Sequence, residues 1–213
     1  NNLMHLKGLL LTFFILFCAS SFSQNKLKLK SGKWLGELHL SASDNLPFEV
    51  EITGKKEKTR ITVINGTERI TLDKILFNKD SLIVSFPNFN SKLVLHQAHK
   101  KLLQGYWQNM NKSAYRIPVE LKHGYTTRFT VYTVTTSSIA EKWEVTFEPQ
   151  SDSPYKSVAL FSNSGNKVSG TFLTETGDYR FLDGNRSGDS LYLSCFDGSH
   201  AFLFKANVFR DSI

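Results

Sequence analysis

The sequence predicts an all-β protein: an antiparallel meander folded as a sandwich or barrel, built from two related β repeats and preceded by a signal-peptide helix. Three observations support this. Apolar and polar residues alternate with a period of two, turn residues separate short runs, and the chain matches a later part of itself when Trp34 is aligned with Trp143. The composition agrees, because 17 Phe, 7 Tyr and 3 Trp stand against 5 Pro among 213 residues, which favours strands.

Residues 1–23 predict a secretory signal peptide. A short basic head ending at Lys7 precedes the apolar run 8–18, and the small residues Ser21 and Ser23 predict cleavage after Ser23. The run is too short for a comfortable bilayer span, so we expect no transmembrane segment after cleavage and a periplasmic or otherwise extracytoplasmic location. A lipoprotein site at Cys18 is the competing interpretation, which Phe17 disfavours. Residues 24–213 then form a β-rich domain.

Strands are expected wherever the alternation is clear, at 46–52, 59–64, 114–121 and 142–147. Turns are expected at Asn65-Gly66 and Asp197-Gly198, among others. Outside the signal segment, helical turns are expected at most near His96–Lys101 or Ser137–Glu141. No alternation of strands with helices occurs, which argues against a parallel sheet.

The internal repeat relates two halves of the chain. Aligning Trp34 with Trp143 also places the segment 80–85 on 189–194, with the apolar positions in phase. The two halves cover about 30–110 and 140–213. A counterpart of the strand around Gly105-Tyr106-Trp107 would fall at 214–216. We therefore expect the second half to be incomplete, and the chain to be a fragment of a longer protein.

The mature chain keeps one cysteine, Cys195, and has no Cys-x-x-Cys motif. His200 and Asp197 are near enough in sequence to suggest a Cys–His–Asp triad. Against this, Cys195 aligns with Phe86 in the first half, an apolar strand position, and Asp197 belongs to a predicted turn. We expect a buried, inert thiol and no catalytic residue, with a redox-labile Cys195 as the remaining alternative.

No metal or cofactor site is predicted. His96 and His99 have a spacing that suits a helix face, but no third ligand is close, and Glu175, Asp178 and Asp183 around a hairpin would bind a cation only weakly.

The chain carries a formal charge of +7, which becomes +6 when the signal peptide removes Lys7 and no acid. Basic runs at 55–60 and 99–101 would suit nucleic acid, but export excludes that partner. These runs are expected to be solvated or to protect sheet edges.

The segments 168–184 and 194–204, with 103–107 and 115–118, resemble the β-rich N-terminal region of exported TlpA-like thiol-disulfide oxidoreductases. In that family a thioredoxin-fold domain with Trp-Cys-x-x-Cys follows this region. The resemblance covers about residues 30–210 and implies a parent protein that reduces disulfides outside the cytoplasm. It carries no catalytic residue to this chain, because the redox motif is absent. The partners that it implies are the C-terminal thioredoxin-like domain and client proteins.

The sequence thus predicts a non-catalytic recognition or docking module of an exported thiol-disulfide reductase that serves extracytoplasmic redox homeostasis. The alternative is a free-standing periplasmic lipocalin-like β-barrel that binds a small apolar ligand or glycan. Gly32-Lys33-Trp34 resembles the start of such barrels, in which the Trp closes one end. A hydrolase built from scattered Asp, Glu and His is a third, less favoured interpretation.

Overall fold

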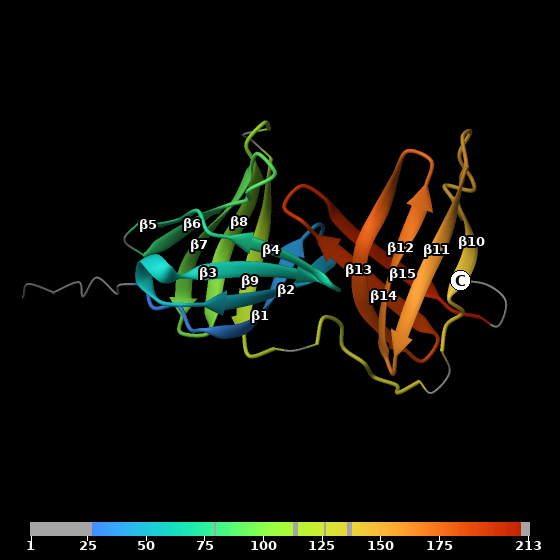
Figure 1. Cartoon of the computed structure of the whole chain (residues 1–213), viewed down its shortest axis with the longest axis horizontal. Helices are drawn as coiled ribbons and strands as arrows, with labels where there is room; N and C mark the ends of the chain where they lie inside the picture. Colours follow the sequence, from blue (N-terminus) through green and yellow to red (C-terminus); the bar gives the residue numbers. More distant parts are fainter. Residues whose placement is uncertain (1–26, 79, 113–114, 126, 136–137, 210–213) are drawn as a thin grey trace, which may run out of the picture.

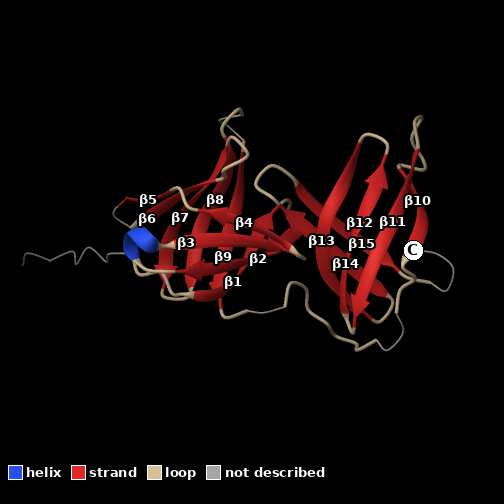
Figure 2. Cartoon of the chain, in the orientation of Figure 1, coloured by secondary structure: helices blue, strands red, loops and turns tan. Residues whose placement is uncertain are grey.

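The computed structural model describes residues 27–78, 80–112, 115–125, 127–135 and 138–209. Within these ranges the protein consists of strands joined by turns, apart from one 3₁₀ turn, η1 (Lys56–Lys58) (Figure 2). The prediction of an all-β antiparallel fold is confirmed. The predicted signal peptide, its cleavage site and Cys18 lie outside the described residues. In the described part, no helix has the length and apolar character needed to span a membrane.

The first sheet has nine antiparallel strands in the order β4-β3-β2-β1-β9-β8-β7-β6-β5 and curls into a nearly closed barrel (Figure 1). The two edge strands are consecutive in the chain, and Ser85 N donates to Lys74 O at 3.2 Å beside the connection between them. The strands are β1 (Gly32–His39), β2 (Asn45–Thr53), β3 (Arg60–Asn65), β4 (Glu68–Leu72), β5 (Ile75–Asn78), β6 (Ser81–Ser85), β7 (Ser91–His99), β8 (Leu102–Asn109) and β9 (Arg116–His123).

The second sheet is a six-stranded antiparallel meander, in which each strand pairs with the next along the chain. It forms a half-barrel whose edges are its first and last strands (Figure 1). A register shift between Gly170 and Phe172 and a positive φ of 55° at Phe181 bend the middle of the sheet. The strands are β10 (Lys142–Phe147), β11 (Tyr155–Ser164), β12 (Lys167–Thr174), β13 (Gly177–Ser187), β14 (Ser190–Phe196) and β15 (Ala201–Asn207).

The two halves are related strand by strand, as the repeat predicted. The alignment of Trp34 with Trp143 places β1, β2 and β3 on β10, β11 and β12, and places β6 and β7 on β14 and β15. The long strand β13 takes the places of both β4 and β5. Among the described residues, the second half contains no strands equivalent to β8 and β9.

The expected helical turn near His96–Lys101 is wrong in part. Strand β7 runs on to His99 with a register shift between Gln97 and His99, and only residues 100–101 form a turn. The described residues 138–141 are not helical either. The spacing of the two histidines suits a helix, but the pairing of β7 with β8 keeps this segment extended.

The connection between the sheets, residues 124–141, runs as a strap along the second sheet in its described parts. The Phe129 ring stacks on Tyr192 with 5.6 Å between centroids, and Phe129 N donates to Asn185 Oδ1. Farther along, Tyr132 N and Thr133 N both donate to Ser187 Oγ. These contacts attach the strap to β13 and β14.

Candidate functional site

The turn between β14 and β15 inserts an aromatic residue into the core of the first sheet. Phe196 is 1% exposed, and its ring lies 4.8 Å from Phe48, 5.5 Å from Phe86 and 6.3 Å from Trp107, centroid to centroid. Fully buried aromatic side chains dominate the energetics of such contacts. The hairpin of the second sheet therefore completes the hydrophobic core of the first, and we call residues 196–200 the hairpin plug.

Polar contacts hold the backbone of the hairpin plug. The Asn65 side chain accepts from Phe196 N at 3.2 Å and donates to Phe196 O at 2.9 Å. Gly198 O accepts from Trp107 Nε1 at 3.1 Å and from Ser91 Oγ at 2.5 Å. All three side chains on the first sheet are buried, so each bond satisfies a group that would otherwise be costly to bury.

Gly198 is required by both conformation and space. Its φ is +96°, a region that side chains with a Cβ rarely adopt, and a Cβ at this position would overlap the Phe86 ring. The turn that the sequence predicted at Asp197-Gly198 is therefore confirmed, but its role is to pack against the other sheet.

A buried ion pair at the start of the strap joins both sheets. Arg128 donates to Ser194 O at 2.9 Å and to Ile64 O at 2.6 Å, and its guanidinium lies 3.8 Å from the Asp183 carboxylate. The side chains of Arg128 and Asp183 are 2% and 1% exposed. Burial lowers the pKa of Arg128, and the charge of Asp183 opposes that effect.

Two atoms of this pair, Arg128 Nε and Asp183 Oδ1, have no hydrogen-bond partner in the described structure. They are close to a hollow of about 180 Å³ whose lining includes Glu49 and Lys167, and Lys167 Nζ lies 3.4 Å from Asp183 Oδ2. A hollow of this size has room for water molecules that would satisfy both atoms. The cluster thus has the character of a structural joint between the halves.

Cys195 is buried on the other face of β14, within the core of the second sheet. It is 4% exposed, and burial raises the pKa of its thiol to about 12, with smaller contributions from Asp197 and Glu68. His200 Nδ1 lies 2.9 Å from Asp197 Oδ2, and no bond links His200 to the thiol among the described residues. The arrangement provides neither the nearby base nor the low pKa that a nucleophilic cysteine needs.

The other residues considered as ligands do not converge. His96 and His99 are exposed on β7, Asp178 pairs with Arg180 at the surface, and Asp183 is buried in the joint. No group of three or more His, Cys, Asp or Glu side chains that could hold a metal ion occurs in the described ranges.

The concave face of the second sheet is lined with aromatic side chains, most of which remain partly exposed, although Phe172 is buried. Phe147, Phe172, Tyr179, Phe202 and Phe204 contact one another edge to face or tilted, with centroids 4.7–6.3 Å apart. Partly exposed aromatic clusters of this kind are typical of docking surfaces. We call these five residues, with Trp143 and Val145 of β10, the open aromatic face.

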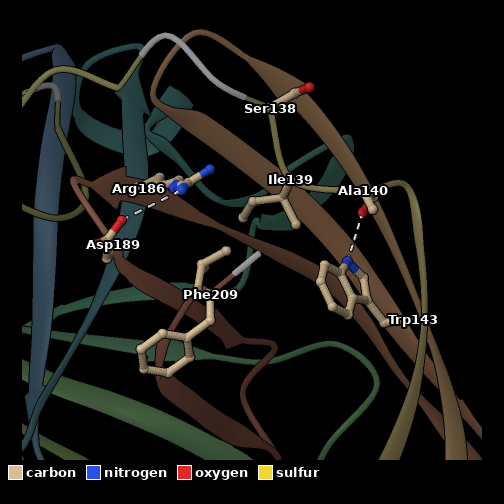
Figure 3. A pocket seen from close by; sticks show the side chains of 8 residues that line it. Ser138, Ile139, Ala140, Trp143, Arg186, Asp189 and Phe209 are labelled. Carbon is tan, nitrogen blue, oxygen red and sulfur yellow. Dashed lines mark hydrogen bonds and ion pairs between the residues drawn. The ribbon is translucent and has the colours of Figure 1, made fainter. Parts of the chain in front are cut away.

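One end of the open aromatic face is hollowed. A cavity of about 610 Å³ lies between the segment that enters β10 and the segment that leaves β15 (Figure 3). Trp143 lines one side and donates to Ala140 O at 2.9 Å, and on the other side Arg186 lies 3.9 Å from Asp189. The face therefore continues into a recess between the two edges of the half-barrel.

The sequence did not identify the hairpin plug or the joint as sites. One signal was available, because the run Leu191 to Phe196 is nearly continuous in apolar character, with only Ser194 breaking it. Such runs are typical of strands buried on both faces, and β14 is buried on both from Leu193 to Phe196. Arg128 offered no local signal.

The comparisons with known proteins give no relatives: no protein-family model, curated protein or solved structure matches the chain.

Proposed function

We propose that this chain is a non-catalytic docking module of an exported thiol-disulfide reductase, and that the open aromatic face is its docking surface. The observation that carries the docking role is this face, a half-barrel interior of aromatic rings that are partly exposed apart from Phe172, with no catalytic group among them. The link to a reductase rests on the resemblance of the β-rich segments to TlpA-like proteins.

The state of Cys195 supports a non-catalytic role. Its thiol is buried and its pKa is raised to about 12, so only a minute fraction would be thiolate near neutral pH. In this proposal the redox chemistry belongs to a thioredoxin-like domain elsewhere in the parent protein. The module positions that domain or its client.

The lipocalin-like alternative finds less support in the packing. The interior of the first barrel is filled by large side chains at 0–1% exposure, among them Leu38, Val50 and Leu95. The hairpin plug adds Phe196 to this core. A filled interior leaves little volume for the cavity that a ligand-carrying barrel needs.

The test of the proposed function uses the reading frame and a reduction assay. We expect a Trp-Cys-x-x-Cys motif downstream of codon 213, and expect the longer protein to reduce an insulin disulfide while residues 24–213 alone do not. Cys195→Ser should leave the activity of the longer protein unchanged. A frame without the motif, or Cys195-dependent reduction by residues 24–213 alone, would refute the proposal.

A further inference from the structure

The two halves differ in exposure at certain equivalent positions. In the second half these positions border the gap between β10 and β15, the edge strands of its sheet. Trp34, Leu38 and Leu95 of the first half are 0–1% exposed. Their counterparts Trp143, Phe147 and Phe204 are partly exposed. The first three lie on β1 and β7, which are separated in the sheet by β9 and β8.

Two pairs of counterparts in the middle of the sheets show no such difference. Val50 is 1% exposed and its counterpart Ala159 is 0% exposed, and Val84 and its counterpart Leu193 are both 0% exposed. On the edge strands β10 and β15 the lost burial falls on residues that border the gap. Away from the gap, Phe181, the 38% exposed counterpart of Leu72, lies where a positive φ bends β13.

Contacts in the first half show what covers these positions. In β8, Trp107 pairs with Leu93 and Gly105 with Leu95, while His123 at the end of β9 packs edge-on against Trp34 with centroids 5.1 Å apart. Trp143, the counterpart of Trp34, instead lines a recess together with Val208 and Phe209.

From these observations we infer that two antiparallel strands bridge β15 and β10 and close the second half into a barrel, and that the polypeptide following β15 supplies them. In the first half, β8 follows β7 after a short turn at 100–101, so the shortest connection is within the same chain. The alignment that places Trp34 on Trp143 gives 211–218 and 225–232 as the counterparts of β8 and β9. The occupant has alternating apolar residues, with a small residue opposite Phe204 as Gly105 is opposite Leu95.

This inference rests on the open aromatic face proposed above as a docking surface and names its occupant, the two strands that the chain itself continues into; it is independent of the redox parentage. If the polypeptide after β15 forms the two strands but no Cys-x-x-Cys follows, the proposed reductase parentage is refuted and the inference stands. If a Cys-x-x-Cys domain follows but the half-barrel stays open, the inference is refuted and the reductase parentage stands.

The test compares hydrogen exchange in residues 24–213 with exchange in a longer protein that continues along its own reading frame through codon 238. Unpaired edge amides exchange quickly and become protected when a strand is added. We expect amides of β10 and β15 to gain at least about tenfold protection, with edge strand β4 unchanged. We also expect the melting temperature to rise by at least about 5 °C.

A proline variant makes the test specific to strand addition. Val208 N donates to Asp189 O at 2.6 Å, so by alternation the N–H of Lys205 points away from β14, toward the gap. Lys205→Pro removes that donor, and Lys205→Ala is its control, because both lose the ion pair with Asp44. Only Lys205→Pro should reduce the protection gained by the longer protein.

A stop codon before position 232 would leave no room for the second strand and would overturn the inference. So would unchanged exchange at β10 and β15 in the longer protein, or equal behaviour of the two Lys205 variants. If residues 24–213 form a dimer that already protects both edges, the occupant is a second copy, and the inference is equally overturned.

Discussion

Truncation of the hairpin plug should destabilise the sheet to which it does not belong. Phe196→Ala removes a ring that is 1% exposed and packs within 6.3 Å of three aromatic rings of the first sheet. Buried Phe→Ala substitutions cost about 3–5 kcal/mol, and we expect about 4 kcal/mol because three neighbours lose contacts. For a domain of this size the melting temperature should fall by about 10 °C.

The control for this prediction is Phe161→Ala. Phe161 is 6% exposed but lies in the core of the second sheet. Urea unfolding followed by tryptophan fluorescence gives the loss in free energy, and hydrogen exchange shows where protection is lost. Phe196→Ala should lower protection in β2 and β8, which carry Phe48 and Trp107, whereas Phe161→Ala should lower it mainly in the second sheet. A cost below about 1 kcal/mol, or loss confined to β14 and β15, would refute the reasoning.

Three further predictions concern the turn, the thiol and the joint. Gly198→Ala should cost about 2 kcal/mol more than Gly165→Ala in urea unfolding, because both have positive φ but only Gly198 faces an aromatic ring; equal costs would contradict this. Cys195 should react with a thiol reagent at pH 8 about a thousandfold more slowly in the folded than in the unfolded protein, since its pKa is raised from 9.0 to about 12. For the same reason its contribution to stability is present below pH 9 and is lost as pH rises toward 12, relative to Cys195→Ala, and rapid labelling of the folded protein would count against it. Arg128→Ala should cost about 3 kcal/mol, because the buried Asp183 carboxylate would be left with the half-exposed Lys167. Arg180→Ala, in an exposed pair, should cost under about 1 kcal/mol; similar costs in thermal unfolding would disprove the role of the joint.

Local patterns were enough to predict the strands and the repeat. The alternation at 142–147 predicted β10 with the bounds that the structure has, and the alignment of Cys195 with Phe86 predicted its burial. Both predictions depend on periodicity within one or two strands, or on the comparison of two halves of one sequence. The turn at Asp197-Gly198 was also predicted from local chemistry.

Contacts between the two halves could not be predicted in the same way. Asn65 and Phe196 are far apart in the sequence and bond through side chain to backbone, so no pattern in either segment signals the pairing. Asn65 was expected as a turn residue, and it ends β3 beside that turn, but its amide also fixes the hairpin plug. Arg128 lies in the strap, where a charged residue ordinarily indicates solvent exposure.

The exposure of Trp143 tests the central claim most directly. Trp34 and Trp107 are 1% and 5% exposed, while Trp143 lies at the border of the open aromatic face. In residues 24–213, acrylamide should quench one tryptophan population readily and the rest poorly, and Trp143→Phe should remove the quenchable population. Uniformly poor quenching, or a quenchable population that persists in Trp143→Phe, would contradict an open docking face on the second half-barrel.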